Sequence, residues 1–180
     1  MRLGVSVLAL WAVGVPALAA TLERLTLEEM AARSTAIVRA KALSSTAVSV
    51  GSTIYTRTRF QVLERWKGAE SAEVEVFTPG GVIGRTAQHY TGVPQFALGQ
   101  ELVLFLWTGR SGRTQVIGYT QGVFEVARAS SSAEPEAVRR TSGEIVLTPG
   151  GAPEPDRELR MPLRSLATRV QDALQRSRTK

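Results

Sequence analysis

His89 is the only histidine in this 180-residue chain, and the sequence contains no cysteine. The lack of cysteine excludes disulfides, thiolate metal sites and cysteine nucleophiles. A zinc site would need carboxylates beside the histidine, and no His and Glu have the spacing of a helical metal motif. The sequence therefore predicts no metal and no other cofactor.

A hydrolase with an unrecognised site around His89 is the catalytic alternative. Asp156 and Asp172 are the only aspartates, both near the carboxyl end, and no Gly-x-Ser-x-Gly nucleophile elbow occurs. His89 also fits an ordinary loop or strand-end residue. Glycines at 80, 81 and 84 could cradle a phosphate, but no Lys-Ser, Lys-Thr or helical pattern follows them, which argues against a nucleotide site.

The candidate binding residues lie in residues 78–100, where the strand pattern is lost among five glycines and two prolines. A long irregular connection inside a domain is either functional or disordered. Residues suited to contact a partner are Arg85, Gln88, His89, Tyr90 and Gln95. The alternative is a structural loop pinned over the end of a barrel by Val82, Ile83, Val93 and Phe96.

A long strand should support this segment. Residues 53–68 alternate, with Ile54, Thr56, Thr58 and Phe60 on one face. Long strands in small domains bend between sheets or wrap a barrel. The preceding strand, residues 35–50, should pair with it through the Gly51-Ser52 turn, and residues 72–77 should add a third strand.

The most apolar strand should be residues 101–107, ELVLFLW, a nearly continuous run typical of a strand buried on both faces. We expect it to be central in the sheet. Further strands are expected at 114–119, 123–126 and 144–147, the last pairing with 123–126. Residues 128–143 are rich in Ala, Ser and Glu, which predicts a mobile loop.

Two helices should flank the β-domain, residues 35–151. Thr26 and Glu29 predict a capping box for a short helix within residues 20–34. Residues 152–160 are interpreted as a charged linker, after which Pro162 should start an amphipathic helix reaching the carboxyl end. Its basic face leaves two alternatives open, docking on its own domain or binding a membrane surface.

The first 19 residues are interpreted as a secretory signal peptide. Met1-Arg2 is a basic start, residues 3–15 are apolar, and Ala17-Leu18-Ala19 precede the expected cleavage after Ala19 or Ala20. We therefore expect a bacterial protein exported to the periplasm or the medium, with no transmembrane anchor after cleavage.

The formal net charge is +6, carried mostly by arginine, with the clearest local excess in residues 157–180. The charge is spread out and no RNA- or DNA-binding motif occurs, so the sequence favours a solvated surface over a nucleic-acid partner. The predicted fold is mainly β, a small antiparallel barrel (OB-like) or sandwich with a short N-terminal helix and an amphipathic C-terminal helix.

Several landmarks carry a family resemblance: residues 36–42, the alternating run from Tyr55 to Trp66-Lys67-Gly68, and the strands around Val74 and Val103. Over residues 35–126 this order resembles the netrin-like modules of tissue metalloproteinase inhibitors, which implies an OB-type barrel. Those inhibitors chelate the protease zinc through an amino-terminal Cys, which this chain lacks, so inhibition and its binding residues do not carry over. The Lys-Gly, Pro-Gly-Gly and Gly-x-Glu landmarks are also similar to a group of uncharacterised exported bacterial proteins, which implies no particular activity.

These observations predict an exported, non-enzymatic binding or interaction module. The expected partner is another exported protein or a component of the cell envelope. The five candidate residues in 78–100 are its predicted contact surface.

Overall fold

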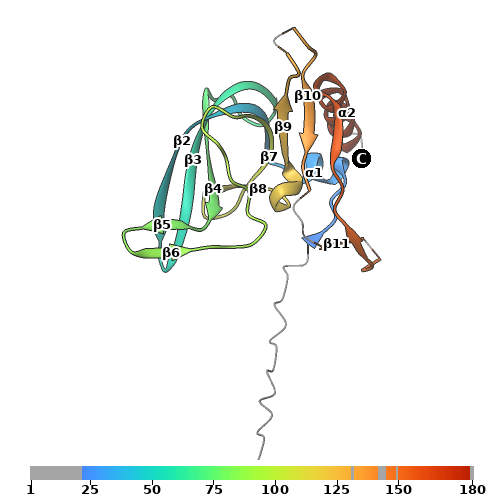
Figure 1. The fold of residues 1–180 in the computed structure, drawn as a ribbon. Helices are drawn as coiled ribbons and strands as arrows, with labels where there is room; N and C mark the ends of the chain where they lie inside the picture. Colours follow the sequence, from blue (N-terminus) through green and yellow to red (C-terminus); the bar gives the residue numbers. More distant parts are fainter. Residues whose placement is uncertain (1–21, 131, 142–144, 149, 179–180) are drawn as a thin grey trace, which may run out of the picture.

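The structure, a computed structural model, describes residues 22–130, 132–141, 145–148 and 150–178 (Figure 1). The predicted signal peptide, residues 1–19, lies outside the described residues. The described chain is mainly β with two helices, as predicted.

The main sheet has the strand order β13-β10-β9-β7-β2-β3-β4, with β8 also paired to β7 (Figure 1). All its pairings are antiparallel. The bounds are β2 (Ala36–Val50), β3 (Thr53–Lys67), β4 (Glu73–Pro79), β7 (Glu101–Thr108), β8 (Thr114–Val116), β9 (Val123–Ala127), β10 (Glu136–Arg139) and β13 (Leu159–Pro162). The β2–β3 hairpin and the central place of β7 are confirmed.

Alternate residues of β7 face two separate cores. Leu102, Leu104 and Leu106 pack on one side of the sheet, in a cluster that also holds Val38 and Phe60. Val103 and Phe105 point to the other side, in a cluster shared with the helices. A strand covered on both faces has no position left for polar side chains, which explains its apolar run.

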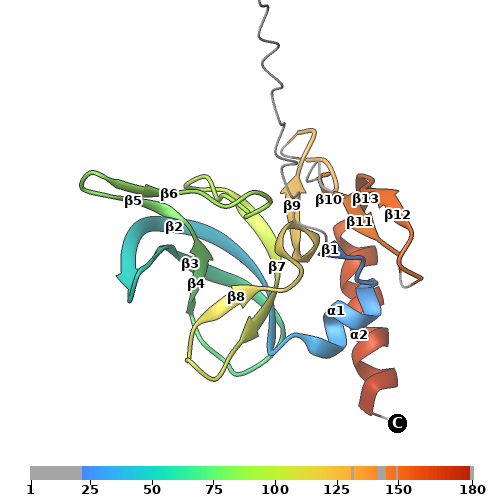
Figure 2. The same ribbon diagram turned by 90° about the horizontal axis from the view of Figure 1, so that it is seen from below.

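The helix-side core is closed by α1 (Leu27–Arg33) and α2 (Leu163–Arg178), which lie side by side away from β5 and β6 (Figure 2). The apolar stripe of α2 is buried at Leu163, Leu166, Val170, Ala173 and Leu174. The helix therefore docks on its own domain. It begins one residue later than predicted, because Pro162 ends β13. No helix in the described ranges is long and apolar enough to cross a membrane.

The predicted capping box holds α1. The Thr26 hydroxyl accepts the Glu29 N–H at 3.1 Å, and the Glu29 carboxylate accepts the Thr26 N–H at 2.8 Å. The Thr26 N–H and the Thr26 hydroxyl, which also donates to this carboxylate at 2.9 Å, lower the pKa of Glu29. At the other end, the Lys67 ammonium donates to the carbonyls of Ala31 and Ala32, at 2.8 and 3.0 Å. The helix is thus tied at its start by its own sequence and at its end by β3.

Three predictions for the C-terminal half were wrong. Residues 128–143 were expected to form a loop, but they contain β10, which pairs with β9. Residues 144–147 were expected to be that partner of β9. Instead, β11 (Ile145–Leu147) pairs with β12 (Pro153–Pro155) and, in parallel, with β1 (Leu22–Glu23). The expected linker, 152–160, therefore contributes strands. Each strand is four residues or shorter, too short for a periodic pattern.

Residues 78–100 are more regular than predicted. β5 (Gly81–Ile83) and β6 (Thr86–Gln88) form a separate hairpin that lies beside the β2–β3 hairpin (Figure 1). The strand expected at 114–119 ends early, and a 3₁₀ turn, Tyr119–Gly122, follows it. β8 comes beside β4, yet no pairing in the described ranges joins them. The main sheet is thus curled but does not close into a barrel.

An ion network lies across β2, β3 and β7. The Arg39 guanidinium contacts Glu64 and lies 2.6 Å from the Glu101 carboxylate, and Arg128 approaches Glu101 to 3.2 Å. Burial acts to raise the pKa of Glu101, but the hydrogen bonds and charges of Arg39 and Arg128 outweigh it, so the pKa is lowered. The folded state is therefore favoured by an ionised Glu101.

Acidification should weaken this stabilisation. The contribution of Glu101 is complete above the ordinary carboxyl pKa of about 4.3 and is lost as pH falls through its lower folded pKa. Urea unfolding at neutral pH and at about pH 3 should show a smaller acid loss for Glu101→Gln than for the wild type. The exposed Glu70→Gln is the control and should follow the wild type. Equal acid losses in all three proteins would contradict the role of Glu101.

Candidate functional site

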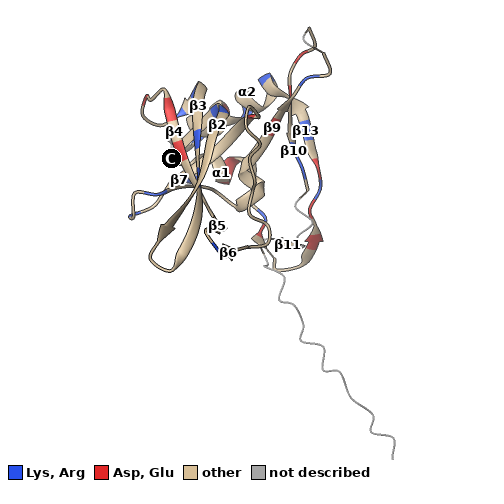
Figure 3. Ribbon diagram, turned by 60° about the vertical axis from the view of Figure 1, so that its left-hand side comes forward, with Lys and Arg blue, Asp and Glu red and all other residues tan. Residues whose placement is uncertain are grey.

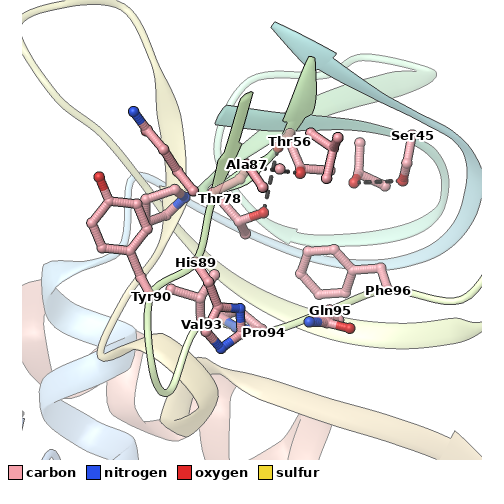
Figure 4. A pocket seen from close by; sticks show the side chains of 16 residues that line it. Ser45, Thr56, Thr78, Ala87, His89, Tyr90, Val93, Pro94, Gln95 and Phe96 are labelled. Carbon is pink, nitrogen blue, oxygen red and sulfur yellow. Dashed lines mark hydrogen bonds between the residues drawn. The ribbon is translucent and has the colours of Figure 1, made fainter. Parts of the chain in front are cut away.

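A pocket of about 490 Å³ opens between the curled sheet, the β5–β6 hairpin and residues 89–96 (Figure 4). Its volume lies within the range of small-molecule sites. We call its polar base the hydroxyl floor, which consists of Ser45, Thr56, Thr58 and Thr78. These residues come from β2, β3 and β4, so the floor is set on the most regular part of the fold.

The hydroxyl floor extends the core cluster that contains Val38 and Phe60, on the side of the sheet away from the helices. Thr56 and Thr58 share the face of β3 that holds buried Phe60, and Thr58 is almost completely buried. Thr56 donates its hydroxyl hydrogen to the Gly80 carbonyl at 2.9 Å. The Ser45 and Thr58 hydroxyls lie 2.9 Å apart. One hydrogen bond between two hydroxyls uses one hydrogen, so within the described chain the other O–H is left for a ligand.

Residues 89–96 form the opposite wall and are anchored by one aromatic contact. The Phe96 ring meets Phe60 edge-on, with centroids 5.1 Å apart and an interplanar angle of 82°. Pro94, within this wall, is buried and lines the pocket. Figure 4 shows His89, Tyr90 and Gln95 on this wall, with Thr56 and Thr78 on the strands behind. The wall is therefore supported from the core while its polar side chains remain accessible.

The structure brings together four of the five predicted site residues. Gln88, His89, Tyr90 and Gln95 line the pocket, whereas Arg85, in the turn between β5 and β6, does not. Within the described chain, the side chains of His89, Tyr90 and Gln95 make no hydrogen bond to the protein and are exposed. These three are the residues available to a ligand.

Gln88 has a structural role instead. Its amide oxygen accepts the Ile54 N–H at 2.7 Å, and its amide nitrogen donates to the Ser52 carbonyl at 2.9 Å. Both bonds fasten β6 to the β2–β3 turn. The alternative of a pinned structural loop fits Phe96, which packs on Phe60, whereas Val82 and Ile83 are largely exposed. Gln88 and Phe96 thus fix the segment to the domain, while other side chains of the segment remain exposed.

Gly80 permits the chain to pass closely over the pocket. Its φ is 101°, and a Cβ there would lie 3.0 Å from the Gln88 carbonyl oxygen. Gly80→Ala should therefore lower the free energy of unfolding by about 1–3 kcal/mol through strain and displacement of β6. Gly84→Ala is the matched control, because its φ is 58° and no atom lies within 4 Å of the added Cβ. Thermal unfolding should rank Gly80→Ala clearly below Gly84→Ala, and the reverse order would contradict the close approach.

No Lys, Arg, Asp or Glu is among the described residues that line this pocket. Figure 3 agrees, with little blue or red around β5 and β6. A hydrolase using His89 would need a carboxylate or similar group to orient the imidazole, and the lining provides none. In the described chain, no cluster of three His, Asp or Glu could hold a metal ion. The geometry provides binding groups without an acid–base pair.

Sequence reasoning missed the hydroxyl floor. The signal was present in the alternation of residues 53–68, since Thr56 and Thr58 occupy the face otherwise given to Ile54 and Phe60. A threonine on the core-facing side of a strand indicates either that the apolar core ends there or that its hydroxyl makes a hydrogen bond. Comparisons with models of protein families, with curated proteins and with solved structures found no match, so the site rests on its own geometry.

Proposed function

We propose that this chain is an exported, non-enzymatic binding module that receives its ligand in the pocket under the β5–β6 hairpin. One observation carries the proposal: the accessible side chains of His89, Tyr90 and Gln95 line one pocket together with the hydroxyl floor, at the edge of the main sheet. Rigid scaffolds commonly carry recognition on such connections. Export is supported by the basic and apolar pattern of residues 1–19.

The partner is an exported protein or a component of the cell envelope. Binding is favoured over hydrolysis because the described lining offers hydrogen-bonding and aromatic groups but no carboxylate. An interface of this kind needs an aromatic anchor with polar neighbours, which Tyr90 and Gln95 supply.

Affinity recovery tests the proposal. Tagged mature protein is crosslinked in its native exported fraction, and the recovered material is compared for the wild type, Tyr90→Ala/Gln95→Ala and Arg85→Ala. The double variant should lose most of the specific partner at an unchanged melting temperature, because both side chains are exposed. Arg85→Ala, outside the pocket, is the control and should retain it. Equal recovery from all three proteins would place the binding surface elsewhere.

A further inference from the structure

A second pocket continues the first. It has a volume of about 230 Å³ and lies where β8 approaches the end of β4. Both pockets are lined by Thr78, Pro79 and Pro94, so they adjoin at these residues. We call the combined surface the aromatic groove, because its exposed rings are Tyr90, Trp107 and Tyr119.

The aromatic groove carries no formal charge. No Lys, Arg, Asp or Glu of the described ranges lines either pocket, although 21% of the chain is charged. Phosphates and carboxylates are recognised by Arg, Lys or arrays of N–H donors, and cations by carboxylates or by aromatic faces. An anion would be desolvated here without a partner, and a cation would have ring faces but no carboxylate to offset its desolvation. The groove is therefore suited to a neutral ligand.

The three aromatic side chains of the groove are unusually exposed to solvent. Tyr90 is 43% exposed, Trp107 46% and Tyr119 40%. Tyr119 has a φ of 54°, and no other described residue except glycine has a positive φ. A non-glycine residue in this region is strained, and such strain is often kept at binding sites. Flat, accessible rings beside fixed prolines offer stacking surfaces at low cost in side-chain entropy.

The polar groups of the groove decide between two neutral ligands that stack on aromatic rings. Proline-rich peptides do so, but a polyproline segment offers carbonyl acceptors and no hydrogen-bond donor. Here the floor has an available O–H from the Ser45–Thr58 pair, and the amides of Gln95 and Gln115 line the two pockets. A ligand with both donors and acceptors can match this O–H and both ends of the two amides, whereas a polyproline segment would leave the amide oxygens unmatched. A sugar presents an apolar C–H face to a ring and hydroxyls at its edge, which matches both features.

We infer that the aromatic groove binds a neutral oligosaccharide. One sugar occupies the larger pocket beside Tyr90, and the chain continues past Pro79 and Pro94 to Trp107 and Tyr119. This inference rests on the proposed binding function and specifies its ligand class.

Calorimetric titration of the mature protein tests it, with neutral hexasaccharides of glucose, of mannose and of N-acetylglucosamine as probes at up to millimolar concentration. A heparin hexasaccharide and decaproline are the comparators. At least one neutral hexasaccharide should bind saturably, and its disaccharide should bind at least about tenfold more weakly because it cannot reach both pockets. Tyr90→Ala and Trp107→Ala should each weaken binding by about tenfold. Trp66→Phe, in the helix-side core, should not.

Failure of all three neutral sugars overturns the inference, as does binding of decaproline or heparin alone. Sugar binding that is unchanged in both Tyr90→Ala and Trp107→Ala overturns the assigned site. These results are distinguishable from failure of the proposed function, which is judged separately by the affinity recovery of Tyr90→Ala/Gln95→Ala. If that recovery stays sensitive to the double variant while no sugar binds, the pocket remains the binding site and the ligand class is wrong.

Discussion

Replacing Leu104 with alanine should lower the free energy of unfolding by about 2–5 kcal/mol. Leu104 is fully buried at the centre of β7, where it pairs in register with Val38 of β2 and Val123 of β9. Removing its side chain leaves a cavity, because the side chains of the two neighbouring strands are held in place by the sheet and cannot move in to fill it. Urea unfolding followed by circular dichroism measures the change directly.

The control is Leu98→Ala, a change of the same chemistry at a position that is 67% exposed. It should alter the free energy of unfolding by less than about 0.5 kcal/mol. A loss below about 1 kcal/mol for Leu104→Ala would mean that β7 is not the structural centre of the sheet.

The central strand could be predicted from sequence because its physical cause is local. A strand covered on both faces must be apolar at every position, and residues 101–107 meet this condition without reference to their neighbours. The β2–β3 hairpin was predictable for a similar reason. Its two long alternating runs are separated by Gly51-Ser52, and Gly51 adopts a φ of 61° that the turn requires.

The missed strands depend on distant partners. β10 contains Ala137 and Val138, both buried, but only the neighbouring β9 and β13 give this short segment an extended structure. β1 is two residues long and pairs with a strand more than a hundred residues away. Composition pointed to a loop at 128–143 because four residues of strand do not alter the average of a Ser- and Glu-rich segment.

The candidate site was predicted in part. Residues 78–100 stood out because glycines and accessible polar residues interrupt the strand pattern, and four of the five named residues do line one pocket. The role of Gln88 could not be predicted, since its partners Ile54 and Ser52 approach only after the hairpins meet. Arg85 lies outside this pocket, which could not be predicted because sequence does not say which side chains of a hairpin turn point toward the domain.

Replacing Asp156 with alanine should also be severe, at about 3–5 kcal/mol. The Asp156 carboxylate lies 3.1 Å from the Arg139 guanidinium, and the two side chains are 3% and 8% exposed. Burial lowers the pKa of Arg139; Asp156 opposes this effect and the nearby Arg24 adds to it. Without Asp156, the Arg139 guanidinium would stay buried, and among the described residues it would keep one hydrogen bond, to the Arg157 carbonyl.

Two further variants separate the charge effect from the loss of packing. Arg139→Met/Asp156→Leu removes both charges and should recover most of the lost free energy, because the penalty comes from an unpaired buried ion. Glu73→Ala, which breaks the exposed pair with Arg59 at 2.7 Å, should cost less than about 1 kcal/mol. Urea unfolding of the four proteins gives the comparison. If Asp156→Ala costs no more than Glu73→Ala, or if the double variant is less stable than Asp156→Ala, the buried pair does not hold β10 to the segment between β12 and β13.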